Sequence, residues 1–138
     1  MVTLDDIRRP IADRIEEFEE FVRSSFCEKE GSLLADMVEY VLSSRGKGLR
    51  PMLTMLSAAA VSTTGDFGKR TMLAAMLIEM IHTASLVHDD VIDESNMRRG
   101  QASVNARWQS RNAVIVGDYI LARNMDIGLR SGQYDLLT

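Results

Sequence analysis

The chain is poor in residues that cross-link or interrupt a fold. It has a single cysteine, Cys27, and only two prolines among its 138 residues. One cysteine cannot form an internal disulfide and has no metal-ligand spacing, so we expect a reducing, cytoplasmic environment. Few prolines leave long stretches free to form helices. Because no repeat, low-complexity tract or linker divides the chain, we expect one domain over residues 1–138.

Long apolar runs and excess positive charge are also missing. No uninterrupted run of 18 apolar residues occurs, and no basic segment precedes an apolar core at the N-terminus, which predicts neither a transmembrane segment nor a secretion signal. The net charge of −4 argues against nucleic acid as a partner. A hydrophobic content of 46% with 26% charged residues is typical of a globular chain that buries a core.

Apolar residues recur at helical spacing along most of the chain, which predicts an all-α fold. The first stretch is expected to be one amphipathic helix in spite of Pro10, and Pro51 is expected to open the third. The run Val114-Ile115-Val116 favours a strand by propensity alone, but it has no second strand to pair with, so we expect helix. The expected helices cover residues 4–26, 33–42, 52–61, 68–93, 103–109 and 112–130.

Three aspartates lie near the end of the most apolar expected helix. At about 100° per residue, Asp89 and Asp93 share a helix face, and His82 falls within about 20° of Asp89. Two anions on one face require a compensating cation, and carboxylate oxygens suit Mg²⁺, which also keeps waters and phosphates in its shell. Asp90 points about 100° away from Asp89, so we expect it to hold water or a neighbouring cation.

Clustered aspartates can equally be a solvated helix end, but a second segment calls for the same ligand. A turn rich in glycine and positive charge precedes Pro51. Its glycines allow close approach of backbone to a phosphate, Lys47 offers a point charge, and Arg50 offers a planar fork that matches phosphate oxygens. Such a turn alone is weak evidence, because most are exposed connectors. Together the two segments predict a site for magnesium and diphosphate.

These segments resemble the trans-isoprenyl diphosphate synthase (polyprenyl synthetase) family from about residue 4 to the end. One departure is Arg45, which stands where the family usually has a glycine. The resemblance implies an antiparallel helical bundle of the isoprenoid synthase type. The motifs that carry it are Gly46-Lys47-Gly48-Leu49-Arg50-Pro51, His82, Asp89-Asp90-Val91-Ile92-Asp93 and Arg98-Arg99-Gly100.

The resemblance also implies roles for residues. Asp89 and Asp93 would bind Mg²⁺ on an allylic diphosphate, farnesyl diphosphate being the expected one, and Arg98 would contact that diphosphate. The allylic carbon would ionise, and isopentenyl diphosphate would attack it and lose a proton. The second substrate, isopentenyl diphosphate, would be held by Lys47, Arg50, His82 and Arg99.

Product length is indicated by the residues one turn before the first aspartate. In this family they form the floor on which the growing tail stops, and here they are Ala84 and Ser85, both small. The chain therefore resembles long-chain synthases of the octaprenyl or solanesyl kind. Two alternatives stay open: small residues also permit close helix packing, and a wall further down could stop a farnesyl or geranylgeranyl product.

The family's second aspartate-rich motif does not occur before Thr138. We therefore expect an N-terminal portion of a longer synthase, ending after about six helices, inactive alone and prone to form homo-oligomers through uncovered apolar faces. A non-catalytic helical subunit or diphosphate-binding module is one alternative, and a terpene cyclase is another. We expect packing roles for Trp108 and Tyr119 and a structural hydrogen-bonding role for Asp118. For His88 two roles stay open, a structural one and one behind the metal ligands.

Overall fold

The structure is a computed structural model that describes residues 1–26 and 31–137. Cys27, on which the expectation of a reducing environment rested, lies outside the described residues. Apart from the connecting turns and one short hairpin, the described chain is helical, which confirms the all-α prediction. In chain order the elements are α1 (Leu4–Arg8), the 3-10 turn η1 (Arg9–Ile11), α2 (Ala12–Phe26), α3 (Leu33–Ser43), α4 (Leu49–Val61), α5 (Lys69–Ile92), β1 (Met97–Arg98), β2 (Gln101–Ala102), α6 (Val104–Arg130) and the 3-10 turn η2 (Tyr134–Leu136).

The first expected helix is broken, so the prediction of one continuous helix over residues 4–26 was wrong. Thr3 and Asp6 form a capping box that starts α1. Pro10 then falls in η1, because its ring excludes the regular helical hydrogen bond at that position. Helix α1 buries no residue, whereas η1 buries Ile11 and α2 buries Phe18, Val22 and Phe26.

Helices α3 and α4 are joined by the glycine-rich turn. Ser32 caps α3 by accepting a hydrogen bond from the Ala35 amide at 3.1 Å. Gly48 has φ of 62°, a left-handed conformation that glycine adopts without strain, and it precedes the first residue of α4. The helix starts at Leu49, before the Pro51 position expected from sequence, and Pro51 lies in its first turn, where no amide donor is needed.

Helix α5 lies at the centre of the fold and matches its expected bounds closely. Gly68 and Asp93 flank it, and methionines and alanines such as Met76, Met80 and Ala84 are almost completely buried. By length and mean hydropathy this helix could cross a membrane, which the absence of an 18-residue apolar run did not anticipate. However, 56% of its most apolar window is buried inside the fold. We therefore describe it as the core helix of the bundle.

A two-stranded antiparallel hairpin follows α5, and the sequence analysis did not foresee it. Met97 pairs with Ala102 and Arg98 with Gln101, so that Arg99 and Gly100 form the two-residue turn. Both turn residues have positive φ, 52° and 79°, as tight hairpins with this twist require. Each strand has only two residues, which is too short to produce a visible alternation of apolar and polar residues.

Helix α6 confirms the two expected helices over residues 103–109 and 112–130, which join across a kink. Ser103 caps the first segment, and Trp108 and Gln109 leave helical geometry. The longer segment packs along α5 over most of its length. There Asn124, fully buried, donates a hydrogen bond from Nδ2 to the Leu77 carbonyl at 3.0 Å.

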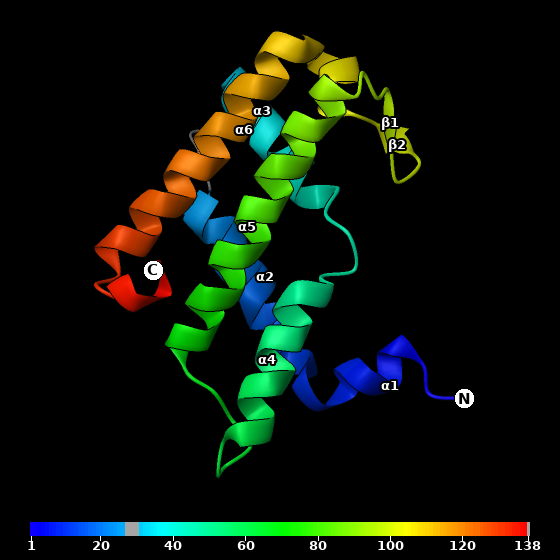
Figure 1. Cartoon of the computed structure of the whole chain (residues 1–138). Coiled ribbons are helices and arrows are strands. Elements are labelled where there is room, and N and C mark those ends of the chain that lie inside the picture. Colours follow the sequence, from blue (N-terminus) through cyan, green and yellow to red (C-terminus); the bar gives the residue numbers. More distant parts are fainter. Residues whose placement is uncertain (27–30, 138) are drawn as a thin grey trace.

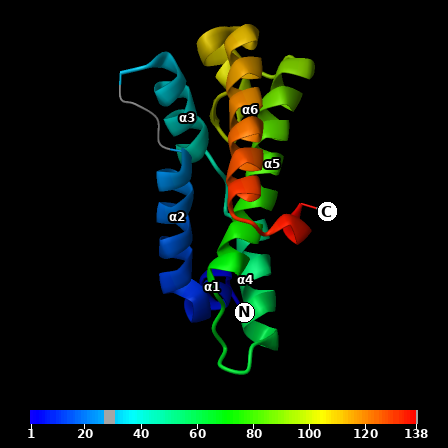
Figure 2. The ribbon, with the colours of Figure 1, turned by 90° about the vertical axis from the view of Figure 1, so that its left-hand side faces the viewer.

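The helices form two layers. Helices α5 and α6 lie side by side in one layer, and α2 and α3 lie behind them in Figure 1 and to one side in Figure 2. Helix α4 runs beside the first half of α5, and the hairpin projects from the opposite end of α5 (Figure 1). This arrangement brings the glycine-rich turn, the end of α5 and the hairpin to the same edge of the molecule.

Candidate functional site

Asp89 and Asp93 lie one turn apart at the C-terminal end of α5. The Asp93 amide donates to the Asp89 carbonyl at 2.8 Å, which places both side chains on the same face of the helix. Both residues are exposed, and within the described part of the chain neither carboxylate makes a hydrogen bond or an ion pair. The two oxygen donors expected to hold a divalent cation are therefore adjacent and accessible.

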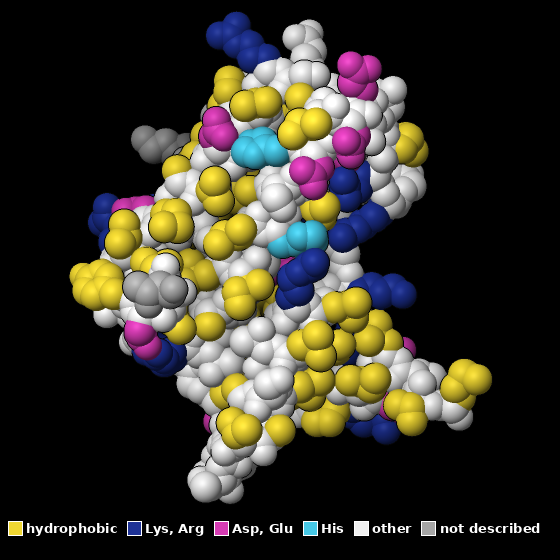
Figure 3. All heavy atoms as spheres, viewed as in Figure 1, with side chains coloured by type: hydrophobic (Ala, Val, Ile, Leu, Met, Phe, Trp, Pro, Cys, Tyr) yellow, Lys and Arg dark blue, Asp and Glu magenta, His cyan; other side chains and the backbone are white. Residues whose placement is uncertain are grey.

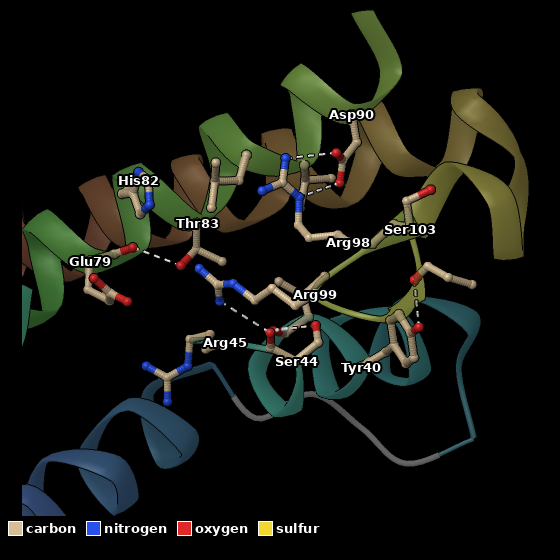
Figure 4. Close-up of a pocket in the computed structure, with 15 residues that line it drawn as sticks. Tyr40, Ser44, Arg45, Glu79, His82, Thr83, Asp90, Arg98, Arg99 and Ser103 are labelled. Carbon is tan, nitrogen blue, oxygen red and sulfur yellow. Dashed lines mark hydrogen bonds and ion pairs between the residues drawn. The ribbon is translucent and has the colours of Figure 1, made fainter. Parts of the chain in front are cut away.

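Asp90 points into the protein instead. It is 4% exposed, and its two carboxylate oxygens accept hydrogen bonds from Nε and Nη2 of Arg98, each at 2.7 Å (Figure 4). The hydrogen bond to Asp90 raises the pKa of Arg98. The neighbouring cation expected for Asp90 is therefore a guanidinium, and Asp90 holds Arg98 beside the exposed aspartates.

Arg99 reaches back from the hairpin turn to the glycine-rich turn. Its Nη1 is 3.4 Å from the Ser44 carbonyl oxygen. A Cβ atom added at Gly46 would lie 2.5 Å from the same Nη1, so glycine at this position lets the guanidinium lie where it does, and a larger residue would displace it. The glycine expected to allow close approach of a phosphate thus also allows close approach of a cation.

The rest of the glycine-rich turn is held from the N-terminal helices. Arg8 of α1 donates a hydrogen bond to the Lys47 carbonyl. Arg45 pairs with Glu19 of α2 and donates from Nε to the Leu42 carbonyl at 3.2 Å. Arg45, which stands where the resembled family usually has glycine, is therefore bound to the protein rather than extended into solvent. The contribution of Arg8 was not predicted from the sequence.

His82 is half-buried on α5, between the two groups of charges. Burial lowers its pKa most, the positive charge of Arg50 lowers it next, and Arg99 and Arg98 add smaller effects in the same direction, while Glu79 raises it. The imidazole is therefore held toward its neutral form. A neutral imidazole donates one hydrogen bond and accepts one.

A cavity that is partly open to solvent joins these groups. His82, Arg98 and Arg99 line it together. Lys47 lines a second, adjacent cavity, and Arg50 lines neither, although its charge reaches His82. The lining residues labelled in Figure 4 are Tyr40, Ser44, Arg45, Glu79, His82, Thr83, Asp90, Arg98, Arg99 and Ser103.

Glu79 is the second residue that the sequence analysis missed. It is 6% exposed and lines both cavities, as Arg45 does. It is also the one acidic residue between Met72 and Val87, so a lone charge in an apolar helix was the signal that could have identified it.

The two small residues before the aspartates point in different directions. Ala84 is 1% exposed and packs in the core, whereas Ser85 is exposed on the face that carries Asp89. The Ser85 hydroxyl donates to the His82 carbonyl at 2.8 Å. Further along this side of α5, Ile81 and Ile78 are also exposed. An apolar strip therefore leads away from the aspartates.

His88 lies on another side of α5, against α6. A Cβ at Gly117 would overlap its Nε2. That nitrogen is 3.3 Å from an oxygen of Asp118. Gly117 and Asp118 thus accommodate an imidazole at the helix contact, in keeping with the structural role left open for His88 and the hydrogen-bonding role expected for Asp118.

The charges of the site suit a polyanion bridged by a cation. In the described residues no group of three or more His, Cys, Asp or Glu side chains could enclose a metal ion. A cation on Asp89 and Asp93 would therefore take its remaining ligands from water or phosphate, as Mg²⁺ does in such sites. Figure 3 shows Lys and Arg side chains beside Asp and Glu side chains along the edge near the end of α5.

The chain is similar to known proteins in sequence. The family described as polyprenyl synthetase matches residues 31–138. The chain is 38% identical over 122 residues to the all-trans-nonaprenyl-diphosphate synthase (geranyl-diphosphate specific) of Rhodobacter capsulatus, covering 88% of this chain and 37% of that protein. It is 43% identical over 105 residues to the octaprenyl diphosphate synthase of Escherichia coli, covering 76% and 32%.

Solved structures show the same similarity. A decaprenyl diphosphate synthase from Rhodobacter capsulatus superposes with a TM-score of 0.82 at 33% identity, over 95% of this chain and 39% of that chain. A polyprenyl synthase from Caulobacter crescentus, complexed with calcium and isoprenyl diphosphate, superposes with a TM-score of 0.82 at 25% identity, over 96% and 39%. The chain thus spans little more than a third of the length of these relatives.

Proposed function

This chain belongs to the polyprenyl synthetase family, and from that premise we propose that it carries the first diphosphate site of a magnesium-dependent prenyltransferase. The reaction joins isopentenyl diphosphate to an allylic diphosphate and yields a long-chain polyprenyl diphosphate. The observation that carries the proposal is the pairing of two free, adjacent carboxylates, Asp89 and Asp93, with a cavity lined by Arg98, Arg99 and His82.

Asp89 and Asp93 would hold Mg²⁺ against the allylic diphosphate. The donor set fits, because both side chains offer oxygen, both are exposed, and neither is engaged by another described residue. The chemistry that Mg²⁺ supplies when bound is neutralisation of the diphosphate charge, which assists its departure. Arg98, fixed in position by Asp90, adds a donor on the same side.

The second substrate, isopentenyl diphosphate, would bind at Arg99, His82, Lys47 and Arg50. The C–O bond of the allylic substrate breaks with its electron pair leaving on diphosphate, and the isopentenyl double bond forms the new C–C bond before a proton is lost. Lys47 and Arg50 lie outside the cavity lined by Arg99 and His82. Binding therefore requires the diphosphate to bridge the two cavities or the side chains to turn inward.

A long-chain product is supported by the exposed strip beyond Asp89. Ser85 is too small to block a tail there, and Ile81 and Ile78 offer apolar surface further along α5. The relatives named above make octaprenyl to decaprenyl diphosphates by their names. Ala84, buried in the core, would affect product length only through helix packing. The same proposal has three further parts. The allylic substrate is farnesyl diphosphate, the chain forms a homo-oligomer, and its location is cytoplasmic.

The test is to incubate the chain with Mg²⁺, farnesyl diphosphate and labelled isopentenyl diphosphate, and to measure Mg²⁺-dependent binding of each substrate alongside product length. We expect binding of both. Asp89→Asn should weaken the Mg²⁺-dependent binding of the allylic substrate about tenfold or more, as loss of a charged ligand does. The matched control is Asp36→Asn, an exposed aspartate on α3.

Product formation by the wild type would show that the chain assembles a complete site. Binding without product would place the missing groups on another part of the enzyme. If neither diphosphate bound with Mg²⁺, or if Asp89→Asn bound as the wild type does, the proposed function would be wrong.

A further inference from the structure

Glu79 occupies a position that the proposed roles do not explain. Its side chain is buried in the middle of α5, and its Oε2 has no hydrogen-bond partner among the described residues. A buried carboxylate without donors is unfavourable unless a positive charge compensates it. No other acid occurs between Met72 and Val87, so the charge of Glu79 acts alone in this helix segment.

Glu79 and His82 lie next to each other on the wall of the same cavity. They are three positions apart, so their side chains are neighbours on the helix surface, and both line the cavity that Arg99 enters (Figure 4). Glu79 also lines the adjacent cavity, in which Lys47 lies. The carboxylate thus lies between the cavity lined by Arg98 and Arg99 and the cavity lined by Lys47.

Several charged groups from different elements act on His82. Cations from α4 and the hairpin disfavour the imidazolium, and burial does so as well, whereas Glu79 favours it. The groups that act on its pKa are Glu79 of α5, Arg50 of α4, and Arg98 and Arg99 of the hairpin. The other titratable groups that line the cavity are Tyr40 of α3, Arg45 of the turn and Asp90 of α5.

A diphosphate changes this balance. Its negative charges pair with Arg99 and the nearby cations, so their repulsion of an imidazolium is largely cancelled. The negative charge of Glu79 remains near the imidazole and continues to favour the charged form. Both anions then favour the charged form, and the imidazolium can donate from both ring nitrogens.

We propose that Glu79 is a positioning residue through which diphosphate binding draws a proton from solvent onto His82. The proton enters at the free ring nitrogen, and the resulting imidazolium donates one hydrogen bond to the diphosphate while Glu79 compensates its charge. This inference rests on the proposed binding of isopentenyl diphosphate, and it adds that binding weakens as the pH rises above neutrality.

The experiment uses isopentenyl diphosphate as the probe and the two histidines of the chain as reporters. NMR of the imidazole resonances at about pH 7 should show His82 moving from neutral to charged when the ligand saturates the protein. His88 is the internal reference, because it lines neither cavity. Calorimetry in buffers of different ionisation enthalpy should show uptake of a proton on binding by the wild-type chain.

Glu79→Gln keeps the shape of the side chain and removes its charge. It should bind isopentenyl diphosphate about tenfold more weakly at about pH 7, corresponding to about one pKa unit at His82, and should lose most of the proton uptake. The control is Glu39→Gln, on the exposed side of α3. His82→Gln should also abolish the uptake, which identifies the group that takes the proton.

The outcomes separate the two proposals. Binding by the wild type without proton uptake, or uptake that persists in Glu79→Gln, would overturn the role of Glu79 and leave the proposed function standing. No binding of isopentenyl diphosphate by the wild type would overturn both. If Glu79→Gln failed to fold, the wild-type calorimetry and the His82→Gln variant would still decide whether His82 takes up the proton.

Discussion

At the scale of single residues, two adjacent aspartates have different structural roles. Asp89 is exposed and free, whereas Asp90 is buried and bound to Arg98 through both oxygens. One helical step of about 100° separates them, so one faces solvent and the other faces the hairpin. The motif therefore combines Asp89, a candidate ligand for a bound metal ion, with Asp90, which holds the guanidinium of Arg98.

We expect Asp90→Asn to lower the free energy of unfolding by about 1–3 kcal/mol, because it removes the charge from a two-fold hydrogen bond to Arg98. Asp89→Asn should change it by less than about 0.5 kcal/mol, as for other exposed substitutions. Urea unfolding of both variants measures the difference. Equal stability of the two would contradict the anchoring role of Asp90.

A second prediction at the scale of single residues concerns Gly46. In Gly46→Ala the new Cβ would lie 2.5 Å from Arg99, so the guanidinium must move away. We expect about tenfold weaker binding of isopentenyl diphosphate, the equivalent of one charge-assisted hydrogen bond. In Gly68→Ala nothing lies within 4 Å of the added atom, and binding should be unchanged. Calorimetric titration would contradict the prediction if both variants bound alike.

At the scale of elements, the site depends on two departures from regular helix. The hairpin carries Arg98 and Arg99 to opposite ends of the cavity wall. Arg98 donates a hydrogen bond to Asp90, and Arg99 donates one to the Ser44 carbonyl. The kink in α6 lets its first segment approach α3, where Trp108 packs edge-on against Tyr40 with ring centroids 5.1 Å apart. Tyr40 in turn donates to the Ala102 carbonyl at 2.7 Å and so holds the second strand.

Gln109 sits in this kink with φ of 70° and ψ of 155°, a conformation that favours glycine. Gln109→Gly should therefore raise the free energy of unfolding by about 1 kcal/mol. Ser110→Gly, one position further along the same helix, should lower it by about 0.5–1 kcal/mol, since glycine weakens a regular helix. Thermal unfolding compares the two, and a loss of stability in Gln109→Gly would count against a strained kink.

At the scale of the whole molecule, apolar side chains remain exposed on the α5 and α6 layer. Val114, Leu121 and Met125 are 40%, 38% and 41% exposed, and helical geometry places them within about 40° of one another on α6. Figure 3 shows apolar side chains spread over this face. Such a stripe favours contact with another protein surface.

We expect this stripe to cause concentration-dependent self-association, measured by sedimentation velocity. Leu121→Lys should shift the distribution toward the monomer with little change in stability, because the side chain is already exposed. Arg111→Ala, on an exposed part of the same helix, is the control. A wild-type chain that stays monomeric at high concentration would rule out the association.

Stability should also depend on pH through His82. Its pKa is lowered in the folded chain, chiefly by burial and by Arg50, so below about pH 6.5 the unfolded chain binds more protons at this position. The free energy of unfolding should therefore fall as the pH drops through this window and level off below the folded pKa. His82→Gln should lack this component. Urea unfolding between about pH 7.5 and about pH 5 compares them, and parallel curves would refute the assignment.

Much of the architecture was predictable because it depends on local patterns. Helical spacing of apolar residues located α3, α5 and both parts of α6. The break at Pro10 was not predicted, because Ile11, which is buried, continues the helical spacing of apolar residues past the proline. The hairpin was missed because its strands are too short for any periodic pattern.

The sequence by itself determined which residues could bind a diphosphate and a cation, since residue type and helical spacing alone bring Asp89, Asp93 and His82 onto one face. Only the tertiary structure decided that Asp90 holds Arg98, that Gly46 makes room for Arg99, and that Glu79 lies between two cavities. These relations join elements separated along the chain. They follow from how α5, the hairpin and the glycine-rich turn pack together, which no local pattern specifies.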